Sequence, residues 1–179
     1  MKKSTVNSVL FLLAIGAGSA LNAADDSKTA MAIEPEKLLP LIKKSLDQGK
    51  YEEAMSQMFR YRVCTHLDAA CSNDPSVVAA QDRLTEIEIS HPKASQIGIK
   101  INFDRLNELR AAVIDQVESD LNGNRLPAPT WVEQYGMGKF MRAFGVASEE
   151  PSFKPETEWI AIRRAKLDEF KATLESSKK

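Results

Sequence analysis

Cysteine and histidine are scarce in this chain of 179 residues, which has two of each. Cys64, His66 and Cys71 lie in one short stretch, and His91 stands apart. A structural zinc site needs about four nitrogen or sulfur ligands, and the spacing of these residues fits no closed zinc motif. The Cys-x-x-Cys pattern of redox proteins is absent as well. We therefore expect no metal site and no cofactor.

The sequence also lacks a catalytic motif, and we expect no catalytic residue. A cysteine nucleophile needs a base that a third group orients, and on a helix His66 would point about 160° away from Cys64. Gly136 and Gly138 do not indicate a phosphate loop, because Met141 stands where that motif has glycine and no strand precedes them. Paired carboxylates leave no local motif, so a small secreted hydrolase that uses Asp or Glu remains the alternative.

Basic residues are not in excess, since 24 Lys plus Arg face 25 Asp plus Glu. The positive charge on which nucleic-acid binding rests is therefore missing, and we expect no nucleic-acid partner. The most basic segment, near the C-terminus, mixes both signs: Arg163, Arg164, Lys166, Asp168, Glu169, Lys171 and Glu175. We interpret it as a solvated helix face.

No charged residue lies between Lys3 and Asp25. Two lysines precede an apolar run at residues 9–20 and small residues follow it, which is typical of a secretory signal peptide. We expect cleavage after Ala23, with Ala20 as the second choice. An uncleaved anchor is the rival, but Gly, Ser and Asn dilute the run below the ~20 apolar residues of a span. Cleavage would leave 156 residues with 22 basic against 25 acidic side chains, a net charge of −3, and no stable membrane insertion.

Apolar residues recur at helical spacing after a polar leader at residues 24–33. They predict one helix that ends at Gly49 and a second that begins near Tyr51, and two helices joined so closely pack antiparallel. Gly49, Tyr51 and Ala54 have a spacing that resembles the turn of a tetratricopeptide-type helical hairpin. The resemblance does not recur one period of ~34 residues later, so it implies hairpin geometry and no function.

The middle of the chain predicts two more helices. Asp74 followed by Pro75 is typical of a helix start, and we expect this helix to run to about Ser90, with an extended linker at residues 97–101. The alternative is a β-hairpin that pairs residues 86–90 with that linker. The most regular apolar face of the sequence lies at residues 104–121 and predicts the next helix.

Two later segments begin with helix-start signals. Thr130 and Glu133 have the spacing of a capping box. Pro155 precedes a last apolar helical pattern and is expected to start its helix.

Aromatic residues are few, and seven of the eleven after Ala23 lie between Trp131 and Phe170. Several have the i,i+4 spacing of a buried helix face. Methionine and aromatic residues beside two glycines are also typical of an adaptable surface that binds a partner. The predicted partner-binding residues are Tyr135, Met137, Phe140 and Met141.

Export into an oxidising compartment favours a disulfide between Cys64 and Cys71. One helix through both would hold their Cα atoms about 10 Å apart, beyond the ~7 Å that a disulfide tolerates. We therefore expect the helix to end between them, since Asp68 and the residues after Cys71 favour turns or caps. His66 would then face solvent.

These observations predict an all-α protein with a signal peptide at residues 1–23, a flexible leader at 24–33 and a single helical domain at 34–179. We expect a compact bundle of five or six helices with an N-terminal antiparallel hairpin. The expected function is that of an exported, periplasmic or secreted, non-enzymatic protein that binds a protein partner, as inhibitor, immunity-type neutraliser or envelope assembly factor. The alternatives are the carboxylate hydrolase and a carrier that holds an apolar ligand between helices.

Overall fold

The computed structural model describes residues 32–79, 90–146 and 151–176. These residues form helices and loops without a β-strand, which confirms the predicted all-α class. The expected signal peptide at residues 1–23, nearly all of the leader, and residues 80–89 of the helix expected up to Ser90 lie outside the described residues.

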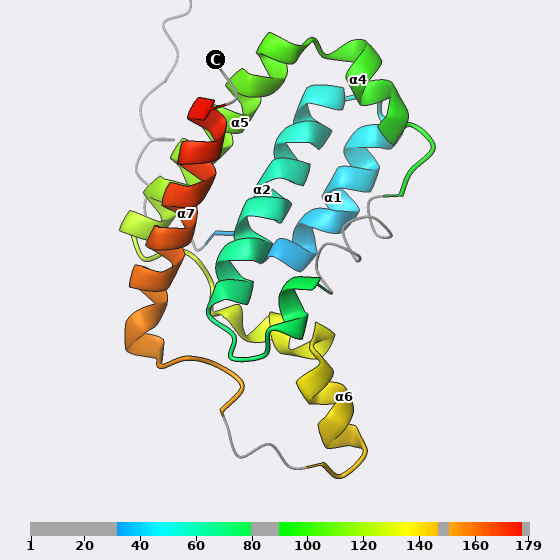
Figure 1. Cartoon of the computed structure of the whole chain (residues 1–179). Coiled ribbons are helices and arrows are strands. Elements are labelled where there is room, and N and C mark those ends of the chain that lie inside the picture. Colours follow the sequence, from blue (N-terminus) through cyan, green and yellow to red (C-terminus); the bar gives the residue numbers. More distant parts are fainter. Residues whose placement is uncertain (1–31, 80–89, 147–150, 177–179) are drawn as a thin grey trace, which may run out of the picture. The chain divides into compact units, whose positions relative to one another are not determined.

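The described α-helices are α1 (Pro35–Asp47), α2 (Tyr51–Ala70), α4 (Ile97–Lys100), α5 (Phe103–Asn122), α6 (Met137–Ala143) and α7 (Trp159–Ser176). Short 3-10 helices precede three of them: η2 (Ala94–Gln96) before α4, η3 (Pro129–Tyr135) before α6 and η4 (Glu156–Glu158) before α7. α2 packs against α1, α5 and α7, and α5 also packs against α7 (Figure 1). Over the ranges described, no helix is long and apolar enough to cross a bilayer.

Gly49 allows the chain to turn between α1 and α2. Its φ of +71° lies in the left-handed region, which glycine adopts without steric cost. Its N–H donates to the carbonyl of Leu46 at 3.1 Å, and the N–H of Lys50 donates to the carbonyl of Ser45 at 2.9 Å. Ala54 is fully buried, so its small side chain lets the two helices approach closely.

Two apolar clusters on α2 hold the helices together. The first lies between α1, α2, α4 and the start of α5: Leu38, Ile42, Leu46, Ala54, Tyr61, Ile97, Ile101 and Leu109. The second lies between α2, α5 and α7: Val63, Cys64, Leu67, Val113, Ile114, Val117, Leu121 and Leu167. The apolar face expected at residues 104–121 is thus buried in both clusters, and Asn102 caps its helix by accepting a hydrogen bond from the N–H of Arg105 at 2.8 Å.

The extended linker expected at residues 97–101 is wrong, and so is the β-hairpin alternative. Residues 97–100 form α4, and Ile101 alone is extended before α5 begins. Ile97 and Ile101 are both buried while Ile99 is 81% exposed. Residues i and i+4 lie on the same face of a helix and also on the same face of a strand. The burial of Ile97 and Ile101 therefore fits one turn of helix as well as the strand that the alternating isoleucines indicated.

A buried ion pair ties α2 to α7. Arg163 Nη2 donates to Asp68 Oδ1 at 2.5 Å, and the two side chains are only 5% and 4% exposed. The same nitrogen donates to the carbonyl of Pro127 at 2.7 Å, and Trp131 Nε1 donates to Asp68 Oδ2 at 2.6 Å. Burial raises the pKa of Asp68, although Arg163 and Trp131 oppose the shift. The prediction of a solvated face at Arg163 is therefore wrong.

Candidate partner-binding surface

α6 and the residues after it expose an unusual density of large apolar side chains. Met137, Phe140, Met141, Phe144 and Val146 are 54%, 56%, 41%, 71% and 47% exposed. The rings of Phe140 and Phe144 contact each other, with their centroids 4.7 Å apart. We call these five residues the α6 surface. Contiguous exposed apolar side chains of this kind mark interaction sites more often than ordinary surface does.

Tyr135, the remaining predicted residue, plays a different part. It is half-buried, its hydroxyl donates to Glu36 Oε1 at 2.9 Å, and its ring packs edge-on against Trp131. Tyr135 therefore anchors η3 to α1. Together with Met137 and Phe140 it lines a hollow of about 480 Å³ beside α6.

Sequence reasoning missed Phe144 and Val146 as members of the exposed surface. Phe144 follows Phe140 at i,i+4, a spacing that we assigned to a buried face. Its exposure of 71% shows that the same spacing here produces an outward-facing stripe.

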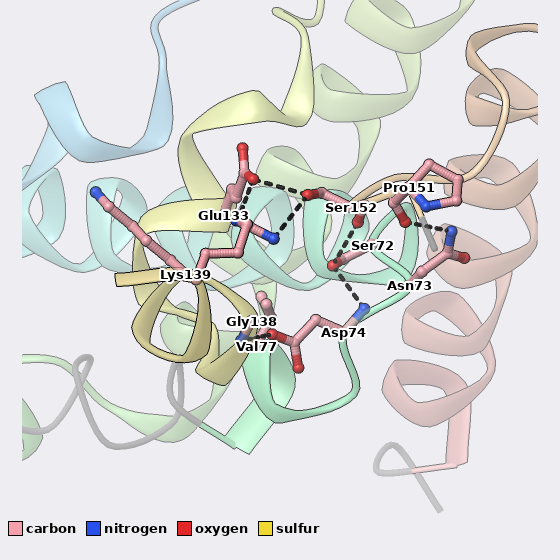
Figure 2. Close-up of a pocket in the computed structure, with 10 residues that line it drawn as sticks. Ser72, Asn73, Asp74, Val77, Glu133, Gly138, Lys139, Pro151 and Ser152 are labelled. Carbon is pink, nitrogen blue, oxygen red and sulfur yellow. Dashed lines mark hydrogen bonds and ion pairs between the residues drawn. The ribbon is translucent and has the colours of Figure 1, made fainter. Parts of the chain in front are cut away.

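One carboxylate fixes the N-terminus of α6 (Figure 2). Asp74 Oδ2 accepts a hydrogen bond from the N–H of Gly138 at 2.7 Å. Asp74 Oδ1 accepts from the N–H of Ser76 at 2.9 Å. Ser76 Oγ donates to Asp74 Oδ1 at 2.5 Å and accepts from the N–H of Met137 at 2.7 Å. Residues 76–79 are helical, so Asp74 caps a helix start as predicted, and it caps α6 as well.

The electrostatics of Asp74 agree with this double role. Partial burial alone would raise the pKa of its carboxyl group, but the hydrogen bonds from Ser76 and Gly138 outweigh burial and hold the pKa below its usual range. The carboxylate is therefore charged at neutral pH, where it complements the positive ends of two helices.

The two glycines before and inside α6 make room for this carboxylate. A Cβ atom on Gly136 would lie 2.4 Å from Asp74 Oδ2 and 2.8 Å from Val77 Cγ2, and one on Gly138 would lie 3.0 Å from Asp74 Oδ2. The Gly136-Met137-Gly138 sequence is thus explained by close approach to an internal carboxylate. No signal in the sequence connects it with Asp74, which lies 62 residues before Gly136.

Glu133 holds the other side of the pocket in Figure 2. Its Oε1 accepts from Ser152 Oγ at 2.7 Å and also pairs with Arg142 of α6. Ser72 Oγ in turn donates to the carbonyl of Ser152 at 3.2 Å. The expected capping box of Thr130 and Glu133 is wrong, because η3 begins at Pro129 without a side-chain cap and Glu133 has these other partners.

This pocket, of about 170 Å³, gives no support to a carboxylate hydrolase. A general acid of that class needs a raised pKa, whereas the pKa of Asp74 is lowered. The hydrogen bonds of Asp74 and Glu133 are instead made to helix ends and to Arg142 and Ser152, so these groups fasten α6 to the neighbouring loops.

The predicted disulfide is not formed, since Cys64 and Cys71 are both free and buried. α2 runs unbroken to Ala70 with Cys71 as its C-cap residue, so helical rise holds the two Cα atoms about 10 Å apart. The helix does not break at Asp68, because the Asp68 side chain binds Trp131 and Arg163, and α2 ends only at Ala70. Burial raises the pKa of Cys64 to about 12 and that of Cys71 to about 11.

His66 was predicted to face solvent, and this prediction is wrong. It is half-buried on α2, and its ring packs edge-on against Phe170 of α7 with centroids 5.7 Å apart. No cluster of three or more His, Cys, Asp or Glu side chains within the described ranges could hold a metal ion. Comparisons with protein-family models, curated proteins and solved structures found no match.

Proposed function

We propose that this chain is an exported, non-enzymatic helical protein that binds a protein partner through the α6 surface. In this proposal residues 1–23 are a signal peptide, and residues 34–179 form one domain, a helical bundle with an N-terminal antiparallel hairpin. The observation that carries the proposal is the exposure of Met137, Phe140, Met141, Phe144 and Val146 on one short segment.

The anchoring of α6 supports this interpretation. A helix of seven residues is too short to be stable alone, and this one is held by the Asp74 cap and by the pair of Arg142 with Glu133. The fold therefore maintains an ordered helix whose apolar side chains face outward. Exposed apolar surface costs solubility, and a partner that covers it removes that cost.

The side chains suggest the chemistry of the partner. A short helix with exposed aromatic and methionine side chains suits a partner that offers an apolar groove, and methionine adapts readily to irregular contacts. Lys139 is exposed on the same helix, so an acidic rim on that groove would add complementary charge.

Replacing Phe140 with glutamate should abolish partner binding while it leaves the fold intact. Because Phe140 is 56% exposed, we expect the thermal midpoint to change by no more than about 2 °C. A charge at the centre of the contact should prevent its burial by the partner. The measurement is quantitative mass spectrometry of proteins that co-elute with the tagged chain from the exporting compartment, together with thermal unfolding of the purified variant.

Phe103→Glu is the matched control, because Phe103 is 60% exposed at the start of α5 and lies outside the α6 surface. A partner in the proposed sense co-elutes with the wild type and the Phe103 variant and is lost from the Phe140 variant. Co-elution that survives both changes, or a large drop in the thermal midpoint of the Phe140 variant alone, would contradict the proposal.

Export predicts a defined mature N-terminus. The protein recovered from the exporting compartment should begin at Ala24, because the small residues before it fit the cleavage site of a signal peptide. Intact mass analysis and N-terminal sequencing measure this directly. A membrane-bound product that retains Met1 would show that the segment is an uncleaved anchor.

A further inference from the structure

α2, α5 and α7 border an apolar groove that contains no residue of the α6 surface. Its volume is about 280 Å³. Phe59 and Val63 of α2, Ile114 of α5, and Phe170 and Leu174 of α7 supply its apolar lining. This volume lies just below the range of about 300–1,000 Å³ that is typical of ligand pockets.

Two guanidinium groups border this apolar lining. Arg62 of α2 is exposed, and Arg110 of α5 lies over the ring of Phe59, with its Cζ 4.7 Å from the ring centroid. Arg110 Nη1 also donates to Asn107 Oδ1 at 3.3 Å, which fixes its orientation. No carboxylate lines the groove, and within the described residues neither arginine has an ion-pair partner.

We propose that this groove binds a medium-chain fatty carboxylate, with the alkyl chain against the apolar lining and the carboxylate paired with Arg62 and Arg110. Apolar contact accounts for the chain, since burying the methylene groups of an alkyl chain removes apolar surface from water. Arginine accounts for the head group, because its planar fork of N–H donors matches a carboxylate. A cationic head would be repelled by both side chains, and an alcohol would leave their charge unpaired.

The proposal is tested by calorimetric titration of the mature chain with decanoate below its critical micelle concentration. Butyrate and decyltrimethylammonium serve as comparison ligands, the first without the long chain and the second without the negative head. We expect saturable binding of one decanoate and no measurable binding of either comparison ligand.

Variants locate the site. Arg62→Gln should weaken decanoate binding about fivefold, as expected for the loss of one solvent-exposed ion pair. Thr173 lines the groove and is exposed, so Thr173→Trp should fill the groove and abolish binding without unfolding the protein. Arg164→Gln is the matched control, because Arg164 is exposed on α7 outside the groove and bonds to Asn122; it should bind decanoate as the wild type does.

Three results would overturn the assignment: equal binding of decyltrimethylammonium, unchanged binding by the Thr173 variant, or loss of decanoate binding in Phe140→Glu. The last would place the ligand on the α6 surface. Because the partner-binding experiment depends on Phe140 and this titration on Arg62 and Thr173, either proposal can fail without the other.

Discussion

Replacing Arg163 with methionine should lower the free energy of unfolding by about 3–5 kcal/mol. The variant leaves Asp68 as a buried charge without its cation and leaves the carbonyl of Pro127 without its side-chain donor. Methionine fills much of the same volume, so the loss is mainly electrostatic. Denaturant unfolding followed by circular dichroism measures it. Arg164→Met is the control: its exposed side chain should change stability by no more than about 0.5 kcal/mol.

Two further measurements separate this mechanism from a simple packing defect. The double variant Asp68→Leu, Arg163→Met has no buried charge, so it should be more stable than Arg163→Met alone. In Arg163→Met alone, the pKa of Asp68 in the folded state should rise further because the cation is lost. The folded variant then binds a proton more tightly than the unfolded chain does. The difference in free energy of unfolding between wild type and variant should therefore shrink as the pH falls from about 7 to about 5. A deficit that is independent of pH would contradict the electrostatic explanation.

This ion pair also marks the limit of what the sequence could predict. Helical periodicity placed α1, the start of α2 and α5 correctly, because each has a local apolar repeat that tertiary packing then buries. Asp68 and Arg163 are 95 residues apart, and each has an ordinary local interpretation, a turn former and a surface base. Nothing local indicates that they meet in the core, and the end of α2 was predicted wrongly for that reason.

The candidate surface was also predictable only in part, because its composition is local in the sequence whereas its support is not. The prediction of Met137, Phe140 and Met141 rested on composition, because methionine and aromatic residues beside glycines are typical of an adaptable apolar segment. The structure exposes all three side chains, as a binding surface requires. Their support was not predictable: Asp74 reaches Gly138 across 64 residues, and only the short contact between them explains why position 138 has no side chain.

The thiols of Cys64 and Cys71 should resist alkylation in the folded protein. A free cysteine with a pKa of about 8.5 is a few per cent thiolate near pH 7, whereas Cys64 with a pKa of about 12 has roughly a thousandfold less. Both sulfur atoms are also buried, and Cys71 Sγ donates to the carbonyl of Leu67 at 3.5 Å. Labelling by iodoacetamide, followed by mass spectrometry, should therefore be slower than in denaturant by about a thousandfold at Cys64 and by at least about a few hundredfold at Cys71, whose pKa is about 11.

Ala112→Cys supplies the matched control, because residue 112 is exposed on α5 and its thiol should react at once in the folded protein. Labelling of Cys64 and Cys71 should follow unfolding, so Arg163→Met should accelerate it by about tenfold for each 1.4 kcal/mol that it removes from the free energy of unfolding. Protein recovered from an oxidising exporting compartment should still carry both thiols, because α2 holds the two Cα atoms about 10 Å apart, beyond reach of a disulfide. A non-reduced mass lower by two hydrogens would show instead that α2 opens before Cys71 and that the cysteines pair.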